Sequence, residues 1–294
     1  MEKAVYHLPG LFEFYDFYRK FLPIYREKTE YFYDWCQIGS LYGAPADCLW
    51  GGGRVGFGDA APGQVLALTE EYGLSARLTF SNSLLRPEHL KDPKCNRLCA
   101  LFGAEPGNGV IVHSELLLAY LKEKYPNFYF VSSTTKVLTD FEDLAAEMER
   151  PDFRYVVPDF RLNKAFDRLA GLKEKRKVEF LCNECCWPGC RERKACYENV
   201  SRKNLGEHCP DHICAAPEGE KGYRFSAAMK NPAFIGIRDI RETYLPMGFS
   251  QFKIEGRGLG SAMLLEFILY YLTKPEYQLP LREEMYLDSM LDLF

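Results

Sequence analysis

The sequence predicts an α/β protein, a TIM-like (β/α)8 barrel with a cysteine-rich insertion after the sixth strand. The first observation is a series of eight short, continuously apolar segments, typical of strands that are covered on both faces. The second is the set of helical segments that alternate with them, which is the pattern of a parallel sheet. Eight such units in 294 residues suit a closed barrel, and an open doubly wound sheet is the alternative.

The elements follow one another with few interruptions. After an aromatic-rich helical opening at about 8–30, the expected strands are 34–40, 76–82, 109–114, 128–134, 154–160, 177–184, 234–239 and 251–257. The clearest helices are 114–126, 139–151, 163–177 and 261–275. Three of these helices begin at residues suited to N-capping, namely Ser114, Thr139 and Asn163.

The pattern predicts one domain over residues 1–275. A cysteine-rich, metal-binding insertion covers 182–232 within it, and residues 276–294 form an acidic, amphipathic tail. We expect the tail to be a helix that docks on the barrel or on a partner subunit. The second case would make the protein a homo- or hetero-oligomer.

Composition and charge limit the classes of function. The 37 basic and 41 acidic residues are well mixed, so no basic face is implied and RNA is not favoured as a partner. The N-terminus has no signal-peptide pattern, and charged residues interrupt the longest apolar stretch, 261–272, too soon for a membrane span. We therefore expect a cytoplasmic protein with reduced thiols and no membrane contact.

Polar side chains follow the expected strands at the point where each strand ends. In a barrel these ends form one rim, where catalytic groups collect. The candidates for substrate binding are Asn82, His113, Asn163, Glu184 and Arg238, and the candidates for catalysis are Glu255 and Arg257. Strands also end in polar turns that merely cap the next helix, a role that suits Asn163 equally well. Arginines that face one cavity would favour an anionic ligand, held by bidentate contacts.

A glycine-rich stretch, "LWGGGRVGFG" (49–58), has the G-x-G-x-x-G spacing of a dinucleotide-binding loop. That fingerprint requires a strand directly before it and a helix after it, and neither is present here. We therefore reject a dinucleotide site. A glycine loop that lets Arg54 approach a substrate is the preferred interpretation, and a simple tight turn is the alternative.

Seven of the 11 cysteines lie between residues 182 and 214. In a reducing compartment such a group indicates a metal site rather than disulfides. Cys182 and Cys185 are spaced C-x-x-C, and Cys186 and Cys190 are spaced C-x-x-x-C, so either pair can hold one zinc ion or two irons of a cubane. The C-x-x-x-C-x-x-C pattern of radical-SAM enzymes is absent. The position at the end of a strand favours a [4Fe–4S] cluster, and zinc is the alternative.

Two stretches carry a family resemblance. In "VEFLCNECCWPGCRERKACYENVSR" (178–202) a strand ends in an Asn-Glu-Cys-Cys turn, followed by further cysteines, an arginine and an aromatic residue. "FKIEGR" (252–257) is the second stretch, and "FIGIRDI" (234–240) and "RLTFSNSLL" (77–85) are weaker matches. Together they resemble the collagenase-like peptidase family of unassigned catalytic type. Cys185 stands where that family has glycine.

The resemblance implies a (β/α)8-like barrel that carries a [4Fe–4S] cluster and hydroxylates RNA bases or a quinone precursor without oxygen. It implies Cys186 and Cys190 as the best cluster ligands, with Cys209 and Cys214 as the remaining pair. Ligand spacing varies among members, so Cys182, Cys185 and Cys196 are alternates. The chain lacks the additional C-terminal domain of RNA-modifying members, which favours a small molecule as substrate.

Three hypotheses follow. The preferred one is an iron–sulfur enzyme that carries out oxygen-independent hydroxylation or related redox chemistry on an anionic small molecule. Arg54, Arg238 and Arg257 would bind carboxylates, and Glu255 would act as a general acid or base. The second is a peptidase or other hydrolase, and the third is a non-catalytic, metal-stabilised subunit of a complex.

Overall fold

The computed structural model describes residues 2–53, 60–217 and 225–291. Its core is one eight-stranded sheet in which every pair of neighbouring strands is parallel, in the order β6-β5-β4-β3-β2-β1-β8-β7. Within the described residues β6 and β7 are joined by the single bridge between Val156 and Val178, which nearly closes the sheet into a barrel. The predicted (β/α)8 barrel is therefore confirmed. The strands are β1 (Ala4–Pro9), β2 (Cys36–Gly43), β3 (Ser75–Phe80), β4 (Gly109–Val112), β5 (Tyr129–Ser132), β6 (Phe153–Val156), β7 (Glu179–Leu181) and β8 (Gln251–Lys253).

Two strand predictions are wrong: one strand was missed and one expected strand is absent, so the total of eight strands is still correct. β1 was not expected, although Ala4, Tyr6 and Leu8 are fully buried and the strand pairs with both β2 and β8. The segment 234–239 is apolar but is not a strand: Ile235 N donates to the Cys182 carbonyl near β7, Phe234 N donates within its own turn to the Asn231 carbonyl, and a helix begins at Ile237. The cysteine-rich segment consequently follows the seventh strand and not the sixth.

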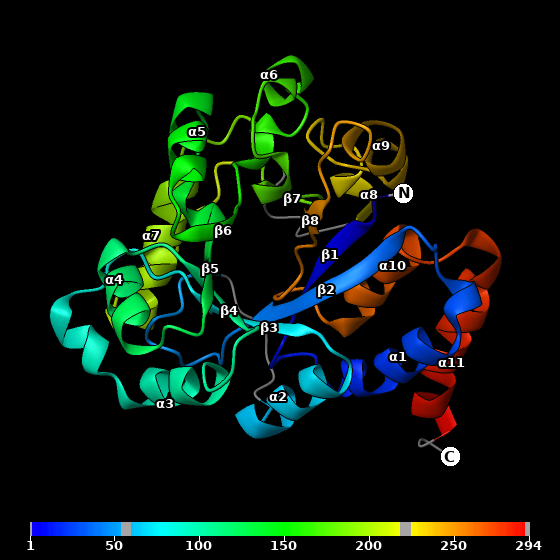
Figure 1. The fold of residues 1–294 in the computed structure, drawn as a ribbon, viewed down its shortest axis with the longest axis horizontal. Helices are drawn as coiled ribbons and strands as arrows, with labels where there is room; N and C mark the ends of the chain where they lie inside the picture. Colours follow the sequence, from blue (N-terminus) through cyan, green and yellow to red (C-terminus); the bar gives the residue numbers. More distant parts are fainter. Residues whose placement is uncertain (1, 54–59, 218–224, 292–294) are drawn as a thin grey trace.

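The helices lie outside the strands (Figure 1). The α-helices are α1 (Tyr15–Glu27), α2 (Pro62–Glu71), α3 (Pro93–Phe102), α4 (Glu115–Lys124), α5 (Phe141–Glu149), α6 (Phe166–Ala170), α7 (Arg193–Asn204), α8 (Phe225–Ala228), α9 (Ile237–Asp239), α10 (Ser261–Tyr271) and α11 (Gln278–Leu291). The short helical turns are η1 (Thr29–Tyr31), η2 (Pro87–Lys91), η3 (Thr134–Lys136), η4 (Phe160–Leu162), η5 (Lys175–Lys177), the π-helical η7 (Ile240–Tyr244) and η8 (Pro275–Tyr277).

The capping predictions hold in part. Ser114 caps α4, since its hydroxyl accepts a hydrogen bond from Leu117 N. The cap of α5 is Asp140, which accepts from Glu142 N, and not the predicted Thr139. The expected helix over 163–177 is reduced to α6 and η5, because the Asn163 side chain binds backbone carbonyls of other segments instead of capping a helix.

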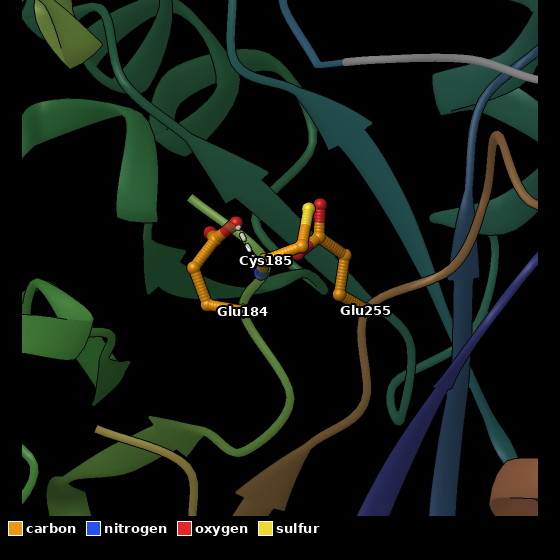
Figure 2. Close-up of side chains that lie close together, drawn as sticks. All are labelled: Glu184, Cys185 and Glu255. Atoms are coloured by element: carbon orange, nitrogen blue, oxygen red, sulfur yellow. Dashed lines mark hydrogen bonds between the residues drawn. The ribbon is translucent and has the colours of Figure 1, made fainter. Parts of the chain in front are cut away.

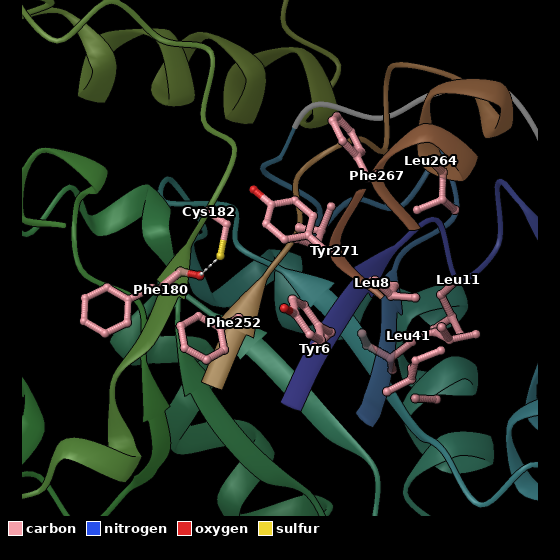
Figure 3. Close-up of a cluster of buried hydrophobic side chains, with 14 of the residues drawn as sticks. Tyr6, Leu8, Leu11, Leu41, Phe180, Cys182, Phe252, Leu264, Phe267 and Tyr271 are labelled. Carbon is pink, nitrogen blue, oxygen red and sulfur yellow. Dashed lines mark hydrogen bonds between the residues drawn. The ribbon is translucent and has the colours of Figure 1, made fainter. Parts of the chain in front are cut away.

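A large hydrophobic core lies between the sheet and the helices. Figure 3 shows part of it, where Tyr6, Phe180, Phe252 and Tyr271 surround Cys182. All of these side chains are buried, so the first cysteine of the cysteine-rich segment belongs to the core.

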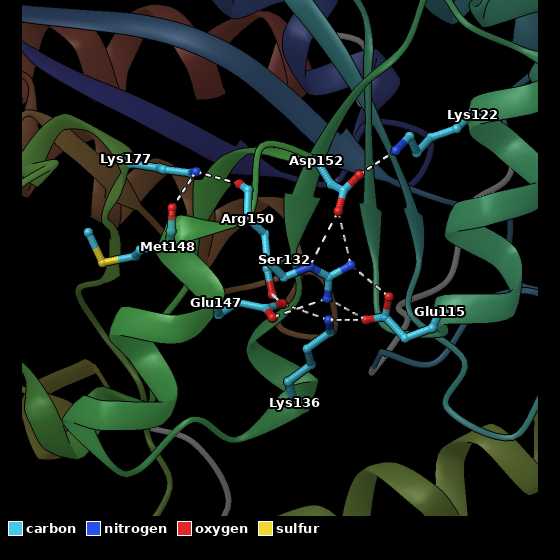
Figure 4. Close-up of polar contacts among 9 residues, drawn as sticks. All are labelled: Glu115, Lys122, Ser132, Lys136, Glu147, Met148, Arg150, Asp152 and Lys177. Atoms are coloured by element: carbon cyan, nitrogen blue, oxygen red, sulfur yellow. Dashed lines mark hydrogen bonds and ion pairs between the residues drawn. The ribbon is translucent and has the colours of Figure 1, made fainter.

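An ion-pair network joins α4, η3 and α5 (Figure 4). The Lys136 ammonium lies 2.6 Å from Glu147 Oε1 and 2.9 Å from Glu115 Oε1. The Arg150 guanidinium binds both of these glutamates and Asp152. Networks of this kind fix the relative position of neighbouring helices better than isolated surface pairs do.

The tail helix α11 packs on the same chain. Leu281 and Met285 are buried, and Glu284 accepts hydrogen bonds from Lys28 and Tyr31, at the end of α1. Within the described residues no helix combines the length and the apolar character needed to cross a membrane.

Candidate active site at the carboxyl end of the barrel

A cavity of about 410 Å³ opens at the carboxyl ends of the strands. The chain that leaves β8 forms one wall of it, since every residue from Glu255 to Leu259 lines the cavity. Lys253, Glu255 and Arg257 all line the cavity, whereas Ile254 between them is fully buried in the core. The predicted catalytic residues Glu255 and Arg257 therefore share one cavity.

The Arg257 guanidinium is held in place by two contacts. Its Nε donates to Glu13 Oε1 at 2.7 Å, and Nη2 donates to the Ala44 carbonyl at 2.9 Å. Glu13 is completely buried, so this charge pair is shielded from water. A side chain at Gly53 would lie about 3.5 Å from Nη1, and the glycine keeps the approach to that nitrogen open. This arrangement leaves one face of a fixed cation directed at the cavity.

Glu255 is positioned by a reciprocal backbone clamp. Its N–H donates to Asn183 Oδ1 at 2.7 Å, and Asn183 Nδ2 donates back to its carbonyl at 3.0 Å. The clamp joins the segment after β8 to the segment after β7. As a result, the Glu255 carboxylate and the Cys185 thiol lie next to each other at the cavity (Figure 2).

Glu184 organises the turn that carries the cysteines. Its Oε1 accepts the backbone N–H groups of Cys185 and Cys186, both at 3.0 Å, and its Oε2 accepts from Arg193 Nη2 at 2.5 Å. Arg193 is also buried and lies 3.5 Å from Asp159. Glu184 lines the cavity, but its contacts are those of a residue that shapes the turn.

Glu184, Cys185 and Glu255 have potential ligand atoms within 4.8 Å of one another. In the described part of the chain no other three histidine, cysteine, aspartate or glutamate side chains come this close. Since both oxygens of Glu184 already accept strong hydrogen bonds, we assign no metal to this group.

The cysteines from Cys185 to Cys214 are free thiols. Cys186, Cys190, Cys196 and Cys209 are partly exposed, and Cys185 and Cys214 are exposed. In the described ranges no three of them gather within the 4.8 Å that one zinc ion would require. A cubane binds each thiolate to a different iron and therefore holds its ligands further apart. The donor chemistry thus fits a [4Fe–4S] cluster: several accessible, unoxidised thiols, of which Cys185 lines the cavity.

Cys182 stands apart from the other candidates. It is fully buried, its thiol donates to the Phe180 carbonyl at 3.6 Å, and burial raises its pKa well above the usual value. A thiol that resists ionisation in an apolar core is a poor metal ligand.

Four further predicted residues do not line the cavity. Asn82 Nδ2 donates to the Leu49 and Ser201 carbonyls, and Asn163 Nδ2 donates to the Leu181 and Ala233 carbonyls, so both tie loops together. His113 Nδ1 lies 2.8 Å from the hydroxyl of Thr135, which does line the cavity. Burial, with Lys136 and Lys194 nearby, lowers the pKa of His113 to about 4.

Arg238 is the fourth predicted residue that does not line the cavity. Its side chain is 85% exposed and pairs with Glu242 on the same helical turn. The expected strand before it does not exist, which explains why it does not reach the rim. Arg54 lies outside the described residues.

Sequence reasoning missed Lys253 and Thr79. Both line the cavity. The hydroxyls of Thr79 and Ser81 are buried at the cavity, and neither has a hydrogen-bond partner within the described residues. Buried hydroxyls of this kind are satisfied when a polar ligand binds.

A charged network fills the barrel beneath the cavity. Arg77 donates to Glu179 Oε2 at 2.5 Å, and His7 Nε2 lies 3.5 Å from the same oxygen. Burial alone would raise the pKa of Glu179, but Arg77, His7 and Lys253 lower it to about 2. Burial, reinforced by Arg77, lowers the pKa of His7 to about 3, so its imidazole is neutral at pH 7.

Comparison with known proteins gives a match at the level of structure. No family model and no curated protein matches the sequence. The structure matches a solved structure entitled "The Structure of the U32 Peptidase Mk0906", with a TM-score of 0.55 and 14% sequence identity. The match covers 88% of this chain and 94% of that one. The U32 peptidases are the collagenase-like family that the sequence resembles, and the chain has the barrel fold of this member.

Proposed function

We propose that the chain is an iron–sulfur protein of the collagenase-like peptidase family that carries out oxygen-independent hydroxylation, or related redox chemistry, on an anionic small molecule. One observation carries the proposal: a single cavity brings together Arg257, Glu255 and the turn from which the thiols begin. The cavity volume suits a small ligand and not a folded nucleic acid or protein.

The anionic character of the substrate follows from Arg257. Its side chain is only 6% exposed and is fixed by Glu13, so it loses little conformational entropy when it binds a carboxylate. The hydroxyls of Thr79 and Ser81 supply additional polar contacts in the same cavity. Glu255 is placed to accept or donate a proton at the bound molecule.

Cys186, Cys190, Cys209 and Cys214 would hold the cluster, with Cys185 and Cys196 as alternates. When bound there, a [4Fe–4S] cluster supplies one-electron transfer next to the substrate. Glu184 orients the first of these thiols by binding the backbone N–H groups of its turn.

Ligand binding by two arginine variants tests the anionic substrate. We expect Arg257→Gln to weaken the binding of small carboxylic acids, measured by calorimetry over a panel of mono-, di- and tricarboxylates, by about tenfold or more, equivalent to about 1.4 kcal/mol. Arg238→Gln is the matched control, because Arg238 is exposed and remote from the cavity. Equal affinities in both variants would remove Arg257 from the site.

A hydrolase is the second candidate. It is favoured by the printed name of the solved structure, which calls that protein a peptidase, and by the Cys185 thiol that lies beside the Glu255 carboxylate. Casein turnover that is lost in both Cys185→Ser and Glu255→Gln, and that needs no iron, would support it over the redox function.

The cytoplasmic location and an oligomer formed through the tail stay predictions of the sequence. RNA as substrate is not favoured, and a zinc ion in place of the cluster is the alternative cofactor.

A further inference from the structure

Lys253 is a buried amine that the proposed redox chemistry does not use. It is the last residue of β8, only 5% exposed, and lines the cavity beside Glu255 and Arg257. Its Nζ lies 4.1 Å from the centroid of the Tyr42 ring. The nearest carboxylate oxygen, Glu179 Oε1, is 3.7 Å away, which is longer than a hydrogen bond.

The charge of Glu179 is already matched by another residue. Arg77 binds Glu179 at 2.5 Å, and both side chains are completely buried. A protonated Lys253, which lies 3.7 Å from the other oxygen of Glu179, would therefore place two buried cations on one carboxylate. Burying such a charge costs free energy, and the cost favours the neutral amine.

The pKa of Lys253 agrees with this placement. Burial is the main cause that lowers it to about 8, and the attraction of Glu179 opposes the shift without cancelling it. Lysines that act as nucleophiles are activated in this way, by burial beside another cation. Charged and titratable groups face the amine from several elements: His7 on β1, Tyr42 on β2, Arg77 on β3, Glu179 on β7, and Glu255 and Arg257 after β8.

The cavity also offers a place for a carboxylate next to the amine. Arg257 and Glu255 line the same cavity as Lys253. The hydroxyls of Thr79 and Ser81 are buried at the cavity and have no partner within the described residues. A ligand that has a carbonyl carbon adjacent to a carboxylate, a 2-oxo acid, would satisfy these groups together.

We propose that Lys253 is a nucleophilic amine that captures a small 2-oxo acid as a Schiff base in this cavity. The neutral Nζ attacks the carbonyl carbon, and the electron pair of the C=O double bond moves to oxygen, which takes up a proton. The nitrogen lone pair then expels this oxygen as water and forms the C=N bond. Amine and carbonyl give imine and water, with no oxidation or reduction, and Glu255 is placed to transfer the protons. The inference needs the cavity but not the cluster.

Reductive trapping with pyruvate tests the inference. The full-length protein is incubated with pyruvate and sodium borohydride, and the product is examined by intact mass and peptide mapping. We expect one carboxyethyl group, attached at Lys253, because borohydride converts the imine into a stable secondary amine. Lactate, which has the carboxylate but no carbonyl, gives no label. A label spread over exposed lysines such as Lys173, or no label at Lys253, would overturn the proposal.

The dependence on pH separates this amine from surface lysines. From a pKa of about 8, the neutral fraction of Lys253 and its labelling rate should rise about tenfold between pH 7 and pH 9, whereas an exposed lysine would rise about a hundredfold. A hundredfold rise at Lys253 would contradict an activated amine.

Variants complete the test. Lys253→Arg keeps the positive charge and should abolish the label, whereas Lys173→Arg should leave it unchanged. Arg257→Gln should raise the pyruvate concentration for half-labelling about tenfold or more, and Arg238→Gln should not. If Lys253→Arg does not fold, the peptide map of the unaltered protein decides alone. Labelling should be the same in protein with and without iron, so a missing label overturns this inference alone, and missing iron in protein that is still labelled overturns the cluster alone.

Discussion

Glu184 and Arg238 are both charged residues that follow apolar segments, but their ion pairs differ in burial and therefore in how much they contribute to stability. Glu184 is buried, binds two backbone N–H groups and pairs with the buried Arg193. Arg238 pairs with Glu242 in full contact with solvent. Removing one partner of a buried pair leaves an uncompensated charge, whereas an exposed pair contributes little.

Glu184→Ala should therefore lower the free energy of unfolding by about 3–5 kcal/mol, because Arg193 would lose its closest anion and keep the 3.5 Å contacts with Asp159 and the Thr134 hydroxyl. Glu242→Ala, the control, should change it by about 0.5 kcal/mol or less. Urea unfolding followed by circular dichroism measures both. Similar losses in the two variants would show that the Glu184–Arg193 pair does not anchor the turn.

His7 gives a prediction about acid stability. Its pKa is lowered to about 3 in the folded state, so the unfolded chain binds more protons once the pH falls below about 6.5. Stability from this residue is complete above that pH and is lost as the pH falls toward 3, by at most about 1.4 kcal/mol per pH unit. His7→Gln should flatten the fall in stability between pH 6.5 and 5, and the exposed His208→Gln should not. An unchanged slope in His7→Gln would contradict this assignment.

Among the helices and strands, the tail helix α11 gives the clearest test of packing within the chain. Leu281 is completely buried against the same chain, and Leu279 on the same helix is 61% exposed. Leu281→Ala should cost about 2–5 kcal/mol, because it opens a cavity beneath α11, and Leu279→Ala should cost much less. Thermal and urea unfolding measure the difference. If both variants behave alike, α11 does not dock on its own barrel in solution.

Element prediction succeeded where apolar runs are continuous and failed at the barrel's first strand. β4 and β5 were recognised because every residue of "GVIV" is buried and "YFVS" is nearly so. β1 contains His7, whose imidazole enters the polar interior of the barrel, so its pattern does not resemble an apolar strand. The segment 234–239 was apolar for a different reason: Ile235 packs in the core beside Tyr271, outside the sheet.

At the scale of the whole molecule, the barrel explains which site residues could be predicted. Glu255 and Arg257 follow a true strand and reach the carboxyl-end cavity, as the topology requires. Asn82 and Asn163 also follow strands or their extensions, but their side chains bind backbone carbonyls and hold the loops of the rim together. Sequence position does not separate these two roles. Lys253 was missed because a buried lysine is recognised only from the charges around it.

The contacts between β7 and β8 also hold the cysteine-rich segment next to the cavity. The backbone clamp between Asn183 and Glu255 holds the exits of β7 and β8 together, and the thiols follow directly from the first of these exits. The barrel is thus the frame that brings a fixed arginine, a carboxylate and the turn at the start of the cysteine-rich segment to one opening. The central claim is that these thiols hold an iron–sulfur cluster at that opening.

Iron and acid-labile sulfide content, determined on protein purified without oxygen, tests this claim most directly. The account predicts about four iron atoms and four sulfides per chain, both lost when Cys186, Cys190, Cys209 and Cys214 are changed to serine. Changing the buried Cys36 to serine should leave both values unchanged. A colourless protein that contains stoichiometric zinc, or iron that persists in the fourfold variant, would contradict the account.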